Sequence, residues 1–454
     1  MSRIIISAAH RSSGKTTICI GLCAALRKRG LIIQPFKKGP DYIDPMWLTA
    51  AAGKECLNLD FFMMGEKKIC EAFQQASQNT DLSLIEGNMG FYDGLDIDGK
   101  DSTSYLSKIL KTPVLLVIDA SRMTYGIAPL VFGYQHFDPD NLISGIILNN
   151  VASTRHEVKL KEAIRKHSDL EVLGAIPRLP EIEIKERHLG LIPIKEDLHL
   201  ISVIESIATV IQNYVDLDKV ISLSRYAFSL PTLKKQEYQI PSPVVKIGIS
   251  RDPVFTFYYK ENLDALARAG AELVPFNTLT DDKLPQVDGL YFGGGFPEIF
   301  IESLSKNKPL LTDIRTSIEQ GIPVYAECGG LMYLARNISY QGITKEMVGA
   351  IPCDICVYEK PQGHGYVILQ TTTKNQWFNF DGKIRGHEFH YSQIINPVQM
   401  NFGYNVIRGK GVNGRHDGII YKNVIASYTH FHSLGVPQWA QQFVSFVERG
   451  KAYK

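Results

Sequence analysis

The segment VYAECGGLMYL places a cysteine where a catalytic nucleophile would be expected. An apolar run over residues 322–326 leads through Glu327 into Cys328, Gly329 and Gly330, and a helical pattern follows. A sharp turn between a strand and a helix exposes a thiol at the helix N-terminus, where the helix dipole favours the thiolate. A buried structural cysteine would not require two glycines at this turn. We therefore interpret Cys328 as a nucleophile.

A cysteine nucleophile needs a base, and two histidines follow about a hundred residues further along the chain. His430 and His432 lie at the end of an apolar strand in ASYTHFHS. Acyl transfer also needs amide donors for the oxyanion, and the turn FGGGFPE offers those of Gly294 and Gly295, while the cysteine turn offers that of Gly329. The combination predicts cysteine–histidine acyl transfer, with His430 or His432 as the base.

A second group of candidate residues lies near the N-terminus. The segment AAHRSSGKTT follows an apolar strand over residues 3–7 and leads into a helical pattern. In this context backbone amides cradle phosphates, lysine contacts the outer phosphates and a threonine hydroxyl reaches Mg²⁺. The phosphate-binding candidates are Gly14, Lys15, Thr16 and Thr17. Two alanines replace the early glycine of the usual motif, so the alternative of an ordinary amphipathic helix start stays open at this point.

Three acidic residues also follow predicted strands. Asp41 and Asp44 occur in QPFKKGPDYIDPMWL, and Glu86 ends LSLIEG. Ligands of an open parallel sheet collect at the carboxyl ends of its strands. Mg²⁺ takes about six oxygen ligands and keeps several waters, so one or two carboxylates beside Thr16 are sufficient. We expect Thr16, Asp41, Asp44 and Glu86 to form a magnesium site, although each acid taken alone could equally be a helix cap or a turn residue.

Buried strands and helices must position these residues. The N-terminal half alternates helical patterns with apolar runs at 3–7, 31–36, 82–87, 112–120, 142–150 and 170–177. Such runs predict a doubly wound parallel sheet covered on both faces. Residues 231–243 lose this periodicity and gain proline and charge, which is typical of a linker. A second α/β series follows, so we expect domains over 1–230 and 244–454.

The composition excludes several classes of protein. The 454 residues include 49 basic and 47 acidic side chains, for a net charge of +2, and no basic tract points to nucleic acid or a membrane surface. No apolar run approaches the roughly 18 residues of a membrane span, and the seven scattered cysteines make no disulfide framework, so we expect a cytoplasmic protein. The pair Cys353 and Cys356 has zinc-like spacing but lacks a second pair.

With these motifs in hand, the chain resembles the cobyrinic acid a,c-diamide synthase family over nearly its whole length. The motifs that carry the resemblance are SSGKTT, PFKKGPDYIDP, NLD, EGNMGFYDG, GAELVPF, GGGFPE, AECGGLMYL, GHEFHYS and SYTHFHS. The resemblance implies an N-terminal amidoligase of the dethiobiotin synthetase type joined to a flavodoxin-like class I glutamine amidotransferase domain. It also implies glutamine, ATP and a tetrapyrrole polycarboxylate as substrates, Mg²⁺ as a cofactor, and a homodimer as the assembly.

The resemblance implies roles for individual residues, with His430 as the base and His432 as a candidate orienting group. Cys328 would attack the glutamine side-chain amide while His430 moves the proton, and the ammonia released would pass internally to the ligase domain. There ATP would phosphorylate an acetate carboxylate of the tetrapyrrole, and ammonia would displace phosphate. Asn149 of GIILNNV would lie near adenine. The substrate-binding candidates are Tyr42, Asp44, Trp47 and Asp93.

Three functional hypotheses remain at this stage. The first is amidation of the a- and c-acetates of cobyrinate, and the second is the same reaction on sirohaem or nickel sirohydrochlorin. The segment after YIDP departs from the family pattern at Met46, Trp47 and Leu48, so a changed ring pocket or local repacking against a helix are both open. The third hypothesis, a regulatory P-loop ATPase, leaves Cys328 and His430 without a role.

Overall fold

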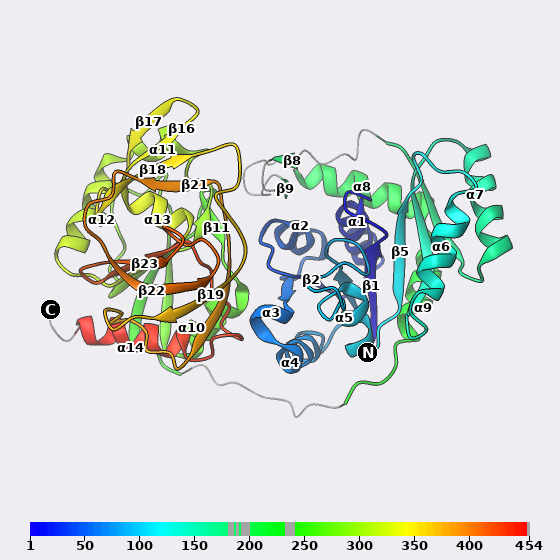
Figure 1. The fold of residues 1–454 in the computed structure, drawn as a ribbon, viewed down its shortest axis with the longest axis horizontal. Helices are drawn as coiled ribbons and strands as arrows, with labels where there is room; N and C mark the ends of the chain where they lie inside the picture. The colour runs from blue at the N-terminus through cyan, green and yellow to red at the C-terminus, as the bar shows by residue number, and fades with distance from the viewer. Residues whose placement is uncertain (180–185, 188–189, 192–199, 232–240, 452–454) are drawn as a thin grey trace. The chain divides into compact units, whose positions relative to one another are not determined.

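The computed structural model describes residues 1–179, 186–187, 190–191, 200–231 and 241–451. The chain divides into two compact units, Met1–Lys235 and Gln236–Lys454 (Figure 1). The linker expected at 231–243 falls largely on residues that lie outside the described ones. Each unit is built around its own sheet, so each can position a site of its own.

The first unit contains a seven-stranded sheet in the order β3-β2-β4-β1-β5-β6-β7, and every strand pair in it is parallel. Its strands are β1 (Ser2–Ala8), β2 (Ile33–Lys38), β3 (Leu57–Leu59), β4 (Leu82–Glu86), β5 (Val114–Asp119), β6 (Ile143–Val151) and β7 (Val172–Pro177). A short hairpin pairs β8 (Glu186–Arg187) with β9 (Gly190–Leu191).

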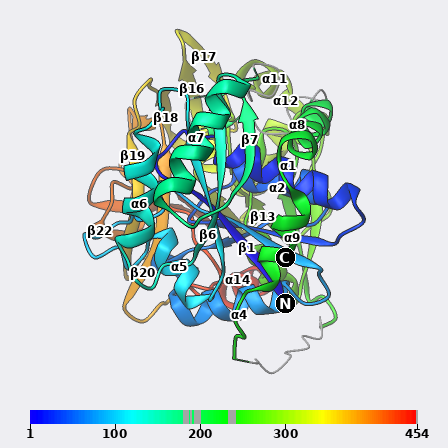
Figure 2. The ribbon, with the colours of Figure 1, turned by 90° about the vertical axis from the view of Figure 1, so that its right-hand side faces the viewer.

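Helices separate the strands of this sheet in the sequence, as parallel pairing requires. They are α1 (Lys15–Lys28), α2 (Ile43–Ala52), α3 (Phe61–Met64), α4 (Glu66–Ala76), α5 (Thr103–Ile109), α6 (Ile127–His136), α7 (Thr154–His167), α8 (Leu200–Tyr214) and α9 (Leu217–Arg225). Helix α1 packs against α2 and α8, and α6 runs beside α7 (Figure 2). The doubly wound parallel sheet expected from the apolar runs is confirmed. Only β3, three residues long, was missed.

The second unit contains a nine-stranded sheet in the order β12-β10-β13-β15-β24-β23-β22-β19-β20. Its strands are β10 (Val245–Ser250), β12 (Ala271–Phe276), β13 (Gly289–Phe292), β15 (Val324–Glu327), β19 (Gly363–Thr371), β20 (Lys383–His390), β22 (Asn401–Arg408), β23 (His416–Tyr421) and β24 (Val424–Ser427). From β12 to β24 the pairs are parallel, and from β24 to β20 they are antiparallel.

Two smaller sheets and five helices complete the described part of this unit. The sheets consist of β11 (Phe255–Phe257) with β14 (Gly294–Gly295), and of β16 (Ala335–Tyr340), β17 (Ile343–Glu346), β18 (Ile351–Val357) and β21 (Ser392–Ile395). The helices are α10 (Lys260–Arg268), α11 (Ile301–Lys306), α12 (Lys308–Glu319), α13 (Gly329–Leu334) and α14 (Trp439–Lys451).

The second unit is therefore a mixed α/β domain, and its parallel half agrees with the second α/β series expected from the sequence. The antiparallel half was not foreseen, because its strands follow one another without helices and carry a weaker apolar pattern. In the described parts of both units, every helix falls short of the length and apolar content that crossing a membrane would require.

Candidate active sites

Cys328 lies at a strained turn between β15 and α13. Its φ of 46° and ψ of −98° lie in a region that residues with a side chain rarely adopt. The Cys328 N–H donates to the Ser427 carbonyl at 2.7 Å, which ties the turn to strand β24. Burial and the nearby Glu298 carboxylate raise the pKa of the Cys328 thiol, whereas a hydrogen bond from the Gly329 amide opposes this shift. The thiol is therefore protonated at neutral pH and needs a base.

His430 is brought to this turn by the neighbouring strand. Strands β15 and β24 pair in parallel with Glu327 opposite Ser427, so the residues that follow both strands are adjacent. The buried Asp417 carboxylate accepts the N–H groups of Tyr428 and Thr429 and fixes the path of the chain into His430. The backbone of His430 also exchanges two hydrogen bonds with that of His387, at 2.8 and 3.1 Å.

The imidazole of His430 has a carboxylate partner that the sequence analysis missed. Its Nδ1 lies 3.0 Å from Oε2 of Glu327, and both side chains are at least 97% buried. Glu327 Oε1 accepts the hydroxyl of Tyr325 at 2.8 Å, and Oε2 lies 3.3 Å from the hydroxyl of Tyr291. The adjacency of Glu327 to Cys328 was visible in the sequence, but its pairing with a residue 103 positions away was not.

The glycines expected to supply the oxyanion hole come together around this turn. A Cβ on Gly294 would lie 2.7 Å from Cε1 and 3.3 Å from Nε2 of His430. A Cβ on Gly329 would lie 2.9 Å from both the backbone N and O of Gly295. The Gly293 amide is already bound to the Tyr258 hydroxyl at 2.8 Å. Only residues without side chains fit in these positions, so the Nε2 edge of His430 faces the glycine turn.

His432 does not take the position of a third catalytic group. Its Nδ1 accepts the N–H of Leu434 at 3.2 Å, and its Nε2 lies 3.6 Å from Oε2 of Glu261. Neither of these contacts leads to the His430 ring. The ring that stacks on His430 is His387, with centroids 5.1 Å apart, and burial together with His430 lowers the pKa of His387 well below its usual value.

In the first unit, Gly14 shapes the expected phosphate loop. Its φ of 86° is left-handed, and a Cβ there would lie 2.2 Å from Nδ2 of Asn149. The Asn149 amide donates to the Ser13 carbonyl at 3.0 Å, so in this structure it braces the loop, and its placement near adenine stays a prediction. Lys15, Thr16 and Thr17 begin α1. Burial and the neighbouring Lys37 lower the pKa of Lys15.

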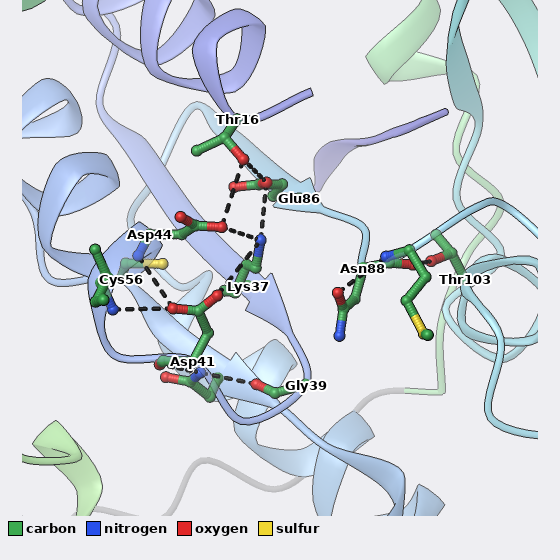
Figure 3. Close-up of polar contacts among 12 residues, drawn as sticks. Thr16, Lys37, Gly39, Asp41, Asp44, Cys56, Glu86, Asn88 and Thr103 are labelled. Atoms are coloured by element: carbon green, nitrogen blue, oxygen red, sulfur yellow. Dashed lines mark hydrogen bonds and ion pairs between the residues drawn. The ribbon is translucent and has the colours of Figure 1, made fainter. Parts of the chain in front are cut away.

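The acidic residues cluster at the carboxyl ends of β2 and β4, which are neighbouring strands (Figure 3). The Thr16 hydroxyl donates to Glu86 Oε1 at 2.6 Å and lies 3.4 Å from Asp44 Oδ2. The ammonium of Lys37 lies among the acids, 2.5 Å from Asp44, 2.8 Å from Glu86 and 3.9 Å from Asp41. Lys37 is the penultimate residue of the buried strand β2, and this unusual place for a charged residue was the signal that could have identified it.

Charge and burial shift the ionisation of this cluster. Although burial alone would lower the pKa of Lys37, Asp44 and Glu86 raise it well above the usual value. Burial raises the pKa of Glu86, and Lys37 opposes the shift. Burial and the Asp44 carboxylate raise the pKa of Asp41 to about 7. Lys37 is therefore a fixed cation held by at least two carboxylates.

The same residues fit a magnesium ion. Oε2 of Glu86 is buried and makes no hydrogen bond to any described residue, so an oxygen ligand is available beside Asp44 and the Thr16 hydroxyl. Asp41 differs from the other two acids, because its Oδ1 accepts the N–H groups of Ile43 and Asp44 at the start of α2. Among the described residues no three His, Cys, Asp or Glu side chains form a metal site by themselves. Mg²⁺ usually takes waters and phosphate oxygens as additional ligands.

The expectation that Trp47 contacts the substrate is not met in this structure. Trp47 and Leu48 are both 0% exposed, because they lie in α2 where it packs against α1. Both side chains therefore belong to the hydrophobic core of the first unit. Asp93 is exposed, and its carboxylate accepts the Gly90 N–H at 3.0 Å. Tyr42 is partly buried and immediately precedes α2.

The cysteine pair and the GHEFHYS motif both lie on strands of the second unit. Cys353 and Cys356 both lie in β18, where residues an odd number apart point to opposite faces; Cys353 is buried in the core and Cys356 is partly exposed. GHEFHYS includes the end of β20. His387 lies next to His430, whereas Glu388 accepts the N–H groups of Lys410 and Gly411.

Comparison with known proteins agrees with both halves of this description. Residues 4–192 match the CobQ/CobB/MinD/ParA nucleotide binding domain, and residues 246–437 match the CobB/CobQ-like glutamine amidotransferase domain. Proteins named cobyrinate a,c-diamide synthase from Magnetococcus marinus, Archaeoglobus fulgidus and Caldanaerobacter subterraneus are 47%, 41% and 39% identical to the chain. The alignments cover 99%, 97% and 97% of this chain and 98%, 96% and 97% of the relatives. The chain therefore belongs to the cobyrinate a,c-diamide synthase family of glutamine-dependent amidating ligases.

Proposed function

We propose that the protein uses ATP and glutamine to convert the a- and c-acetate carboxylates of cobyrinate into amides. Residues 1–230 would form the ligase domain, 231–243 the linker and 244–454 the glutaminase domain. The full-length similarity to three proteins named cobyrinate a,c-diamide synthase supports the substrate. The observation that carries the proposal is the strained Cys328 turn beside His430 in one unit, together with a phosphate loop and acidic cluster in the other.

The glutaminase half begins with proton transfer from the Cys328 thiol to Nε2 of His430. The sulfur then attacks the side-chain carbonyl carbon of glutamine, and the carbonyl electron pair moves to the oxygen. The amides of Gly294, Gly295 and Gly329 are the candidate donors to this oxyanion, which preorganised N–H groups stabilise strongly. Collapse of the intermediate releases ammonia with the proton from His430 and leaves a glutamyl thioester. Water hydrolyses the thioester and regenerates the thiol.

The ligase half consumes this ammonia. An acetate oxygen of the tetrapyrrole attacks the γ-phosphorus of ATP, the bond to ADP breaks, and an acyl phosphate forms. Ammonia then attacks the carbonyl carbon, phosphate leaves, and one proton is lost. Phosphorylation is needed because a free carboxylate has no adequate leaving group. A second cycle amidates the second acetate.

Residues around the phosphate loop are suited to bind ATP and balance its charge. Gly14, Lys15, Thr16 and Thr17 would bind its phosphates, since a helix N-terminus and a lysine favour anions. Mg²⁺ would be held by Thr16, Asp44 and Glu86, and the ion would neutralise the charge that develops on the phosphates. Asp41, whose Oδ1 accepts the backbone amides of Ile43 and Asp44, is a further candidate ligand. Asn149 would brace the loop and lie near adenine. Tyr42, Asp44 and Asp93 are the remaining candidates for contact with the tetrapyrrole.

The test is amidation by the purified full-length protein with ATP and either glutamine or an ammonium salt. Cobyrinate, nickel sirohydrochlorin and sirohaem are supplied in parallel, and products are followed by mass spectrometry. We expect cobyrinate to be converted to its diamide with either nitrogen source and to be used in preference to the other rings. No amidation of cobyrinate, or a clear preference for either alternative ring, would contradict the assigned substrate.

A further inference from the structure

His432, two residues after His430, makes its contacts with Leu434 and Glu261. A histidine base nevertheless needs a partner at its second ring nitrogen, which selects the tautomer and stabilises the imidazolium that forms during proton transfer. In this structure that partner is Glu327, which precedes the nucleophile, with Oε2 3.0 Å from Nδ1 of His430.

The surroundings of Glu327 hold its carboxylate in one orientation. Tyr325 donates to Oε1 at 2.8 Å, and the Tyr291 hydroxyl lies 3.3 Å from Oε2. Burial and the Glu327 charge raise the pKa of both tyrosines well above its usual value, so both hydroxyls remain donors. A carboxylate that already accepts these bonds can only accept from His430 as well. The Nδ1 atom must therefore carry a proton, and Nε2, on the edge beside Gly294, is the basic atom.

The other titratable side chains around His430 do not supply this interaction. The Nε2 of His387 lies 2.7 Å from the Tyr259 hydroxyl, and the lowered pKa of His387 keeps its ring neutral. His432 is directed to Leu434 and Glu261. Both histidines are therefore neighbours of the catalytic pair.

We propose that Glu327 is the positioning residue of the glutaminase site. It holds Nδ1 of His430 protonated, so that Nε2 accepts the Cys328 proton, and its negative charge stabilises the imidazolium until the proton passes to the departing ammonia. This inference rests on the proposed glutaminase reaction and assigns the third member of its catalytic group.

The test compares Glu327→Gln with Glu261→Gln in the full-length protein. Glu261→Gln is the control, because it makes the same carboxylate-to-amide change next to a different histidine. Oε2 of Glu261 lies 3.6 Å from Nε2 of His432. Glutamate release from glutamine is measured across pH, so the readout does not depend on the tetrapyrrole. For Glu327→Gln we expect kcat to fall by about 10²-fold or more with little change in KM, because the wrong tautomer is costly. Loss of the negative charge should also move the acidic limb of the pH profile to lower pH.

The outcomes separate this inference from the proposed function. Glu261→Gln should keep the wild-type pH profile, and Glu327→Gln should keep its activity with ammonium salts, which demonstrates a folded protein. If Glu327→Gln does not fold, the His430 ring nitrogens are observed by NMR in the wild type, and a protonated Nε2 with a bare Nδ1 would overturn the inference. Equal kcat and pH profiles for wild type and Glu327→Gln would also overturn it while leaving the function intact. If the wild-type protein releases no glutamate from glutamine, the proposed function itself is contradicted.

Discussion

Replacing Gly294 by alanine tests the geometry of the glutaminase site with a single methyl group. The backbone at Gly294 is not in the left-handed region, so the substitution introduces no backbone strain. The added Cβ would lie 2.7 Å from Cε1 of His430 and 3.1 Å from Cβ of Phe257. An ordinary contact begins near 3.4 Å, so the imidazole must move by about 0.7 Å, which is 3.4 minus 2.7.

The size of this shift sets the expected loss of activity. Misplacing a catalytic group by about 1 Å costs about 10²-fold in rate. We therefore expect the glutamine-dependent kcat of Gly294→Ala to fall by roughly 30- to 100-fold, which corresponds to about 2–3 kcal/mol of activation free energy. Amidation with ammonium salts should be unaffected, because it does not use His430.

A matched control is available in strand β13. A Cβ on Gly289 would lie 2.8 Å from Cγ2 of Val447, so Gly289→Ala introduces similar crowding away from the catalytic residues. Both variants are assayed with glutamine and with ammonium, and their thermal unfolding is recorded. Gly289→Ala should lower stability and leave the ratio of the two activities unchanged. A Gly294→Ala protein that uses glutamine as well as the wild type would refute the position of His430 against this glycine.

Three further substitutions or treatments have defined outcomes. Cys328→Ser should abolish glutamine-dependent amidation and keep ammonium-dependent amidation, and retention of glutamine use would contradict its role as nucleophile. Because burial raises the pKa of the Cys328 thiol, its alkylation by iodoacetamide, followed by peptide mass spectrometry, should be slow at pH 7 and still rise with pH above 9. A rate that levels off below pH 8 would contradict this. Lys37→Met should lower the melting temperature, because it leaves buried carboxylates without a cation, and added Mg²⁺ should restore more stability to the variant than to the wild type. If Mg²⁺ raises the melting temperatures of the variant and the wild type equally, the idea that Mg²⁺ and the Lys37 ammonium occupy the same position among the carboxylates is contradicted.

Much of the fold could be predicted because its signals are local. The apolar runs of β1, β4, β5, β6 and β7 are buried on both faces of a parallel sheet, so their sequences are rich in apolar residues. The antiparallel strands β19, β20, β22 and β23 have a weaker apolar pattern than these parallel strands, and no helices lie between them in the sequence. Their place beside the parallel strands depends on pairing between distant segments, which a local pattern does not record.

The position of Trp47 shows where a local pattern was insufficient. The unusual residues after YIDP suggested a contact with the tetrapyrrole, but the side chain is fully buried where α2 packs against α1. Both a binding pocket and a helix interface favour a large apolar residue, so its type alone could not distinguish them. The packing of α2 decided between these alternatives.

The sequence by itself determined the motifs whose parts are contiguous: the glycine, lysine and threonines that begin α1, and the cysteine at the turn between β15 and α13. Such motifs are set by backbone conformation over a few residues. Only the tertiary structure decided that Lys37 lies among Asp44 and Glu86, and that Glu327 pairs with His430. These contacts form because the order of the strands in each sheet brings the ends of distant segments together. Side chains that can pair then meet there, and the spacing of residues along the sequence does not reveal which of them will do so.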